Sequence, residues 1–133
     1  MKVVLDSNVL LAATIADGLC RQVLRHCLVQ ETLITSEHIL DEYAERLANK
    51  FRVDPRRDPF WQRFTDRAKI VNPSPLAKPV CRDRDDDWVL ATAQTAAADV
   101  IVTGDADLLT LHSFANIPIV TPRRFLEMLT ASE

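Results

Sequence analysis

A short apolar run that ends on a carboxylate opens this sequence. Val3, Val4 and Leu5 are followed at once by Asp6 and then by helix-forming residues. An unbroken apolar run of this length is typical of a strand in a parallel sheet that is buried on both faces. Ligands bind such sheets at the carboxyl ends of the strands. The first strand therefore predicts that Asp6 lies at a binding edge.

Strand and helix patterns alternate along the rest of the chain. Further strands are expected at 32–35, 68–71, 100–103 and 117–120, and the main helices at 19–28, 37–50, 88–98 and 122–129. This alternation predicts a central, mostly parallel sheet of about five strands with helices on both faces. A length of 133 residues fits a single domain over residues 1–133.

Composition limits the classes of function. The net charge is -3, so there is no overall basic field for nucleic acid, and any such contact must use a local patch. The cysteines Cys20, Cys27 and Cys81 form no Cys-x-x-Cys pair, which favours reduced thiols over a disulfide framework or a thiolate zinc site. The first residues lack a signal-peptide pattern, and no apolar run approaches the ~20 residues of a membrane span. We therefore expect a cytoplasmic protein without membrane contact.

Carboxylates recur at the ends of the expected elements. Asp6 and Asp105 follow strands, Glu42 borders the apolar face of a helix, and Asp87 precedes the alanine-rich helix. Carboxylates that are brought together repel one another unless a cation compensates them, and no lysine or histidine lies in these motifs. A hard divalent cation, Mg²⁺ or Mn²⁺, is the natural partner. Such a cation would polarise a phosphodiester and lower the pKa of a bound water.

Each acid also has a purely structural interpretation. Asp87 and Asp105 could be helix caps, Glu42 could be a surface residue, and Asp83, Asp85 and Asp86 could be solvated. Asn8 and Ser36 could support the site or merely cap helices. The histidines His26, His38 and His112 share no ligand spacing, which argues against zinc. The hypothesis of a metal site rests on the convergence of the acids.

The order of these strings resembles the PIN-domain family, specifically the bacterial toxin-type members. The matching pieces are Val-Val-Leu-Asp-Ser-Asn-Val-Leu at 3–10, Ser36 with Glu42-Tyr43, Arg-Asp-Arg-Asp-Asp-Asp at 82–87, Val-Thr-Gly-Asp-Ala-Asp-Leu-Leu at 102–109 and Ile-Val-Thr-Pro-Arg-Arg-Phe-Leu at 119–126. Together they run almost from one end of the chain to the other. The resemblance implies a three-layer α/β/α sandwich and a Mg²⁺- or Mn²⁺-dependent ribonuclease, commonly a toxin with a cognate antitoxin and often a homodimer.

The resemblance also implies roles for individual residues. Asp86 competes with Asp87 for one position, and the spacing back from Thr103 favours Asp87. The implied catalytic and metal-binding quartet is Asp6, Glu42, Asp87 and Asp105, with Asp107 as a further ligand and Asn8, Ser36, Asp86 and Thr103 in auxiliary positions.

We therefore expect hydrolysis of single-stranded RNA by a metal-activated water. Trp88 could stack on a base, although its place on a buried helix favours the core. A phosphate-binding rim is expected from arginines, namely Arg52, Arg56, Arg57, Arg63, Arg67, Arg82 and Arg84, although solvated ion pairs would explain them equally well.

Two alternatives to a nuclease remain open. Haloacid-dehalogenase-like phosphotransferases also begin with a strand that ends on aspartate, but their chemistry needs a second aspartate where this chain has Asn8. A catalytically silent PIN-like domain that only binds a partner is the other alternative. The presence of all four acids of the quartet argues against that silence.

Overall fold

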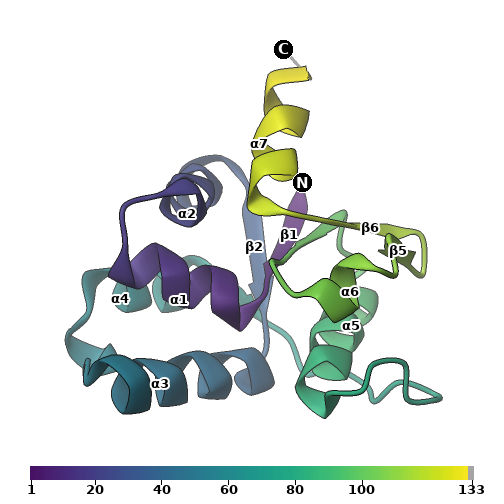
Figure 1. Cartoon of the computed structure of the whole chain (residues 1–133), viewed down its shortest axis with the longest axis horizontal. Helices are drawn as coiled ribbons and strands as arrows, with labels where there is room; N and C mark the ends of the chain where they lie inside the picture. Colours follow the sequence, from purple (N-terminus) through teal and green to yellow (C-terminus); the bar gives the residue numbers. More distant parts are fainter. Residues whose placement is uncertain (132–133) are drawn as a thin grey trace.

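A six-stranded sheet forms the middle layer of the molecule (Figure 1). The computed structural model describes residues 1–131. The strands lie in the order β3-β2-β1-β4-β6-β5, and all neighbours pair in parallel except β5, which runs antiparallel to β6. They are β1 (Lys2–Leu5), β2 (Thr32–Thr35), β3 (Lys69–Ile70), β4 (Val100–Val102), β5 (Ser113–Phe114) and β6 (Ile117–Val120).

Helices cover both faces of this sheet. The helices α1, α2 and α4 lie on one side, α5 packs on β1 and β2 from the other, and α3 packs on both α1 and α5 (Figure 1). The predicted three-layer α/β/α sandwich is therefore confirmed. The bounds are α1 (Ser7–Ile15), α2 (Leu19–Gln30), α3 (Glu37–Phe51), α4 (Pro59–Arg67), α5 (Arg84–Ala96), α6 (Ala106–Leu109) and α7 (Pro122–Ala131), with a 3₁₀ turn η1 at Pro55–Arg57.

The central strands explain the apolar runs in the sequence. Val3 to Leu5 and Val100 to Val102 are fully buried because helices cover both faces of β1 and β4. Tyr43, Phe64 and Phe125 are the largest fully buried side chains and fill the helical layers. Within residues 1–131 no helix combines the length and the hydropathy needed to cross a membrane.

Two elements differ from the sequence-based expectations. The sheet has a sixth strand, β5, joined to β6 by Ala115 and Asn116, whose φ angles of 51° and 66° close a tight hairpin. The hairpin was not predicted because neither turn residue is a glycine. Helix α5 starts at Arg84 rather than near Trp88, because the Asp83 side chain accepts the backbone N–H of Asp85 at 2.9 Å and caps the helix.

Candidate metal centre

Sheet register brings the first site residues together. Leu5 pairs with Val102 across β1 and β4, so the residues that follow, Asp6 and Thr103, lie side by side at the carboxyl edge. The Asp6 backbone N–H donates to the Val102 carbonyl oxygen at 3.0 Å, and this bond continues the ladder past the end of β1. The prediction that Asp6 lies at this edge of the sheet is confirmed by these contacts.

Asp6 is a buried carboxylate, 2% exposed. Its Oδ2 accepts a hydrogen bond from the Thr103 hydroxyl at 2.7 Å. Burial raises the pKa of Asp6, the Thr103 hydrogen bond opposes that rise, and the nearby charge of Asp105 adds to it. Thr103 Oγ1 also accepts the backbone N–H of Asp105 at 3.0 Å, so one hydroxyl ties Asp6 to the start of the next acidic segment.

Glu42 reaches the same edge from α3. The Ser7 hydroxyl donates to its Oε1 and lies 3.4 Å from Asp6 Oδ1, so Ser7 connects the two carboxylates. Glu42 Oε2 is buried, and no residue among 1–131 donates a hydrogen bond to it. Burial, together with the neighbouring Asp85 carboxyl group, raises the pKa of Glu42 to about 7. Arg46, one turn further along α3, offsets this rise with Nη1 at 3.7 Å from Oε1.

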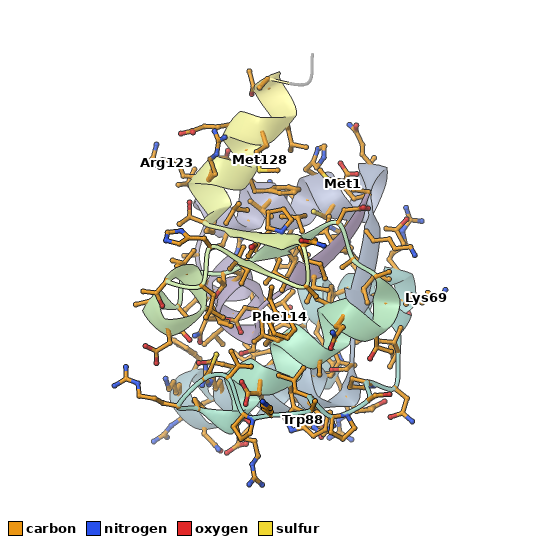
Figure 2. The ribbon with its side chains drawn as sticks, turned by 90° about the vertical axis from the view of Figure 1, so that its right-hand side faces the viewer. Met1, Lys69, Trp88, Phe114, Arg123 and Met128 are labelled. Carbon is orange, nitrogen blue, oxygen red and sulfur yellow. The ribbon has the colours of Figure 1, made fainter. Side chains whose placement is uncertain are left out.

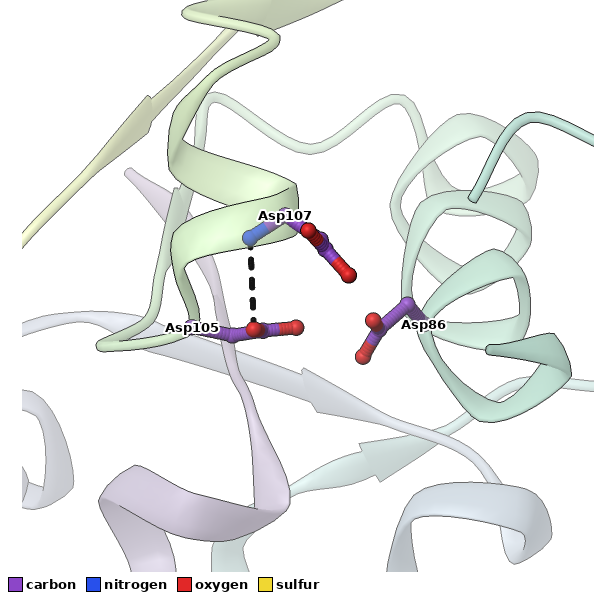
Figure 3. A group of neighbouring side chains, drawn as sticks. All are labelled: Asp86, Asp105 and Asp107. Carbon is purple, nitrogen blue, oxygen red and sulfur yellow. Dashed lines mark hydrogen bonds between the residues drawn. The ribbon is translucent and has the colours of Figure 1, made fainter. Parts of the chain in front are cut away.

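Three further acids form a cluster between α5 and α6. Asp86 extends from α5 toward Asp105 and Asp107 at the start of α6 (Figure 3). One carboxylate oxygen from each lies within 4.8 Å of the others. Burial raises the pKa of Asp86 to about 8, and the neighbouring Asp105 carboxyl group and the charge of Asp6 add to the rise. Asp105 in turn accepts the backbone N–H of Asp107 at 3.3 Å.

Asp87 lies outside this cluster, contrary to the register favoured by its spacing from Thr103. Its carboxylate accepts the backbone N–H groups of Val80, at 3.1 Å, and Cys81, at 2.8 Å. The reason is the early start of α5, which places the whole acidic run in the first helical turn. Successive residues of a helix point about 100° apart. Asp85 therefore faces Glu42, Asp86 faces Asp105, and Asp87 turns back to the preceding loop.

Of the four predicted auxiliary residues, Asp86 and Thr103 contact the acids, whereas Ser36 and Asn8 make their hydrogen bonds elsewhere. The Ser36 hydroxyl accepts a hydrogen bond from Thr92 on α5 at 2.9 Å, and both residues are buried. The Asn8 side chain accepts from Arg46 rather than contacting the acids directly. Ser7, Asp85 and Arg46 were not predicted as site residues. These contacts depend on how α1, α3 and α5 are rotated about their axes. The spacing of apolar residues in the sequence does not determine that rotation accurately.

The arginines predicted to bind RNA do not form one continuous rim. Arg82 makes a two-nitrogen ion pair with Asp107, with its Nη2 at 2.8 Å from Oδ1. Arg56 pairs with Asp54 in the turn before α4. Arg67 donates to the Leu28 carbonyl oxygen at the end of α2. Arg84, which directly precedes the acidic run at 85–87, is exposed. Three more exposed arginines lie in and around η1 and α4, namely Arg52, Arg57 and Arg63.

The arrangement fits a divalent cation. All the donors that face the edge are carboxylate oxygens, the preferred ligands of Mg²⁺ and Mn²⁺. A buried Glu42 oxygen without a donor and a pKa near 8 at Asp86 indicate negative charge that the described residues do not fully compensate. The residues able to hold such an ion are Asp6, Glu42, Asp86, Asp105 and Asp107.

Comparisons with known proteins agree with this geometry. The PIN-domain family model matches residues 2–107. No curated protein matches the sequence. A structural match is a chain in the crystal structure of VapBC2 from Rickettsia felis bound to a DNA fragment from their promoter. Its TM-score is 0.63 at 15% identity, over 91% of this chain and 98% of that chain, so the likeness concerns the fold.

The family model removes one of the two alternatives left by the sequence. Its match spans most of the chain, from β1 through the Asp105 segment, and therefore excludes the haloacid-dehalogenase-like alternative. The sheet order and the acids at its carboxyl edge are consistent with that match. The chain belongs to the PIN-domain family, whose members are generally nucleases.

Proposed function

We propose that this protein is a Mg²⁺- or Mn²⁺-dependent endoribonuclease that cleaves single-stranded RNA and acts as the toxin of a toxin–antitoxin pair. One observation carries the proposal. Five carboxylates from four parts of the chain converge on the carboxyl edge of β1 and β4, and burial and mutual repulsion raise the pKa of several of them. Such an arrangement is costly for stability, and a bound cation would relieve it.

The protein's own residues would position the reactants. A divalent ion held by Asp6, Asp86 and Asp105 would polarise the phosphodiester and lower the pKa of a water. Thr103 fixes the carboxylate of Asp6, and Ser7 fixes that of Glu42. In this proposal Asp86 takes the position that the spacing argument gave to Asp87, because only Asp86 faces Asp105.

Cleavage of unstructured RNA tests the activity. Purified protein should cut a labelled single-stranded RNA with Mn²⁺ or Mg²⁺, and EDTA should stop the cleavage. Asp105→Asn should remove activity while the protein stays folded, because the change relieves repulsion in the empty site. Cleavage that survives EDTA would refute the metal mechanism, and a folded protein without any nuclease activity would favour the catalytically silent alternative.

An antitoxin partner is part of the proposal. The structural match is to VapBC2, a complex bound to DNA from its own promoter, and toxin-type PIN proteins commonly have such a partner. A small gene immediately beside the one for this chain should encode a protein that co-purifies with it and inhibits the cleavage. Co-expression of the two gene products, followed by affinity purification of one of them, checks this directly.

We also propose a homodimer in the cytoplasm. The dimer follows from the family resemblance, and the location fits an RNA substrate and cysteines that are all free. Light scattering on the purified chain should give about twice the mass of one chain. A single-chain mass at high protein concentration would refute the homodimer without affecting the nuclease assignment.

A further inference from the structure

A cavity lies on the side of α5 where Asp87 meets the preceding loop. Its volume is about 260 Å³, and its lining includes Trp88, Lys78, Arg84, Leu76 and Pro79. We propose that this cavity binds one nucleotide of the single-stranded RNA, with the base against Trp88 and the adjoining phosphate beside Lys78 and Arg84. The proposal rests on the ribonuclease function and adds a subsite to it.

Trp88 is held in place as a stacking surface. It is only half-buried, although its position on α5 favoured the core. The His38 ring stacks on it with the ring centroids 3.8 Å apart and the planes 5° from parallel. Since His38 covers one face of the indole, Trp88 offers the cavity its second face or its edge. Aromatic side chains fixed in this way are the usual platforms for the bases of single strands.

The loop that lines the cavity is also fixed. The loop at 75–79 contains Pro75 and Pro79, which restrict its backbone. Just beyond it, the Asp87 carboxylate accepts the backbone N–H groups of Val80 and Cys81 and fastens the loop to the first turn of α5. Asp87 is therefore a positioning residue for the cavity rather than a ligand of the metal centre. A wall that is already ordered lowers the entropic cost of binding.

The charges at the rim favour a phosphate. Lys78 and Arg84 are exposed, and neither makes an ion pair with any residue among 1–131. By contrast, Arg82 and Arg46 are paired with acids of the metal centre. Unpaired cations in a protein of net charge -3 form the kind of local patch that nucleic-acid binding requires here.

The cavity and the metal centre lie close together because both use the first turns of α5: Trp88 lines the cavity and Asp86 belongs to the acidic cluster. His38 and Glu42 are one helical turn apart on α3, roughly 6 Å along its axis. They face Trp88 and Asp85, respectively, on α5. A strand whose phosphate lies at the acids would therefore find Trp88 within about one nucleotide of that phosphate. This short distance favours the RNA itself over a separate protein partner as the occupant.

Binding of a short fluorescein-labelled oligouridine RNA, measured by anisotropy in EDTA, tests the proposal. EDTA prevents metal-dependent cleavage, so affinity is measured independently of activity. Trp88→Leu should weaken binding about tenfold without changing its salt dependence, because base stacking is lost. Lys78→Ser and Arg84→Ser should each make the negative slope of log K against log salt less steep by about 0.7, because each removes one phosphate contact.

Matched controls separate a local effect from unfolding. Arg123→Ser removes an exposed cation at the opposite end of the molecule from Trp88 (Figure 2) and should leave affinity and slope unchanged. In a Trp61→Phe protein, Trp88 is the sole tryptophan, and its fluorescence should be quenched by unlabelled oligouridine. Lys78 and Arg84 are exposed, so their replacement tests the cavity even if Trp88→Leu fails to fold.

The outcomes distinguish the subsite from the function on which it rests. If the protein cleaves RNA but the cavity variants keep wild-type affinity and salt slope, the subsite is refuted and the nuclease stands. If wild-type protein never cleaves RNA but binds oligouridine through Trp88, Lys78 and Arg84, the nuclease proposal fails and the subsite stands. If oligouridine does not quench the fluorescence of the Trp61→Phe protein, the RNA does not contact Trp88, and the proposal is overturned.

Discussion

Glu42 and Asp86 retain their protons to unusually high pH. Burial and neighbouring carboxyl groups raise the pKa of Glu42 from 4.5 to about 7 and that of Asp86 from 3.8 to about 8. In the unfolded chain both carboxyls lose their protons near their ordinary pKa values. Between those values and about pH 8, the folded state therefore binds more protons than the unfolded state. The free energy of unfolding of the metal-free protein must fall as pH rises through that window.

Thermal unfolding in EDTA between pH 5.5 and 7.5 measures this effect. The Tm should decline over this range, and Mn²⁺ should restore more of it at pH 7.5 than at pH 5.5, because protons compete with the cation for the same oxygens. Asp86→Asn should flatten the decline, since the amide cannot titrate in this range. A Tm that rises with pH in EDTA would contradict the proposed origin of the pKa shifts.

Asp86 and Asp87 are neighbours with opposite expected roles. Asp86→Asn should abolish the Mn²⁺ binding that calorimetry detects. It should leave urea unfolding unchanged or shifted to higher urea, because an amide needs no proton uptake on folding, whereas the carboxyl of Asp86 does. Asp87→Ala should retain Mn²⁺ binding but lower the free energy of unfolding by about 1 kcal/mol, because the Val80 and Cys81 N–H groups lose their acceptor. The reverse pattern would restore Asp87 as the ligand.

The ends of β1 and β4 act as one unit through Thr103. Thr103→Val keeps the side-chain shape but removes the donor to Asp6 and the acceptor for the Asp105 backbone. We expect the free energy of unfolding to fall by about 1–3 kcal/mol, because these groups are buried or half-buried. The pKa of Asp6 should rise further, and Mn²⁺ affinity should fall.

Thr103→Ser is the matched control, because it keeps the hydroxyl. Urea unfolding and Mn²⁺ calorimetry on both variants measure the two effects separately. Equal behaviour of the valine and serine variants would show that the hydroxyl does not organise the carboxyl edge.

The elements that the sequence predicts well are those with regular apolar spacing. The run at 3–5 predicts β1 and the place of Asp6, because a strand buried on both faces has only apolar residues until it ends. Helix α5 is harder to delimit because its first turn is charged, and its start depends on the Asp83 cap. That shift of four residues is what separated Asp87, the expected ligand, from Asp86, which faces the other acids.

Contacts that depend on the rotation of whole helices could not be predicted. Ser7 reaches Glu42, and Arg46 reaches Asn8, because α1 packs on α3 in one particular orientation. The β5–β6 hairpin escaped prediction for a local reason, since Ala115 adopts a left-handed conformation that alanine rarely takes. The sequence identifies the acids, whereas the packing of the helices determines which groups each acid contacts.

The molecule as a whole should gain stability from a divalent cation. A ligand that binds only the folded state, at a hundred times its dissociation constant, adds about 2.7 kcal/mol to the free energy of unfolding. Mn²⁺ should therefore raise Tm by several degrees at neutral pH. NaCl at the same ionic strength should not, and Asp105→Asn should lose the Mn²⁺ effect. An equal response to both salts would indicate general screening of charge instead of a bound ion.

The two outermost strands limit how this molecule can meet other chains. Both β3 and β5 contain only two residues, so each edge of the sheet presents very little free main chain. An extended peptide that joined the sheet by strand addition would gain few main-chain hydrogen bonds at either edge. Such short edges also protect against edge-to-edge aggregation. We therefore expect a partner of this protein, the proposed antitoxin included, to bind through side chains on its helices and loops rather than by lengthening the sheet.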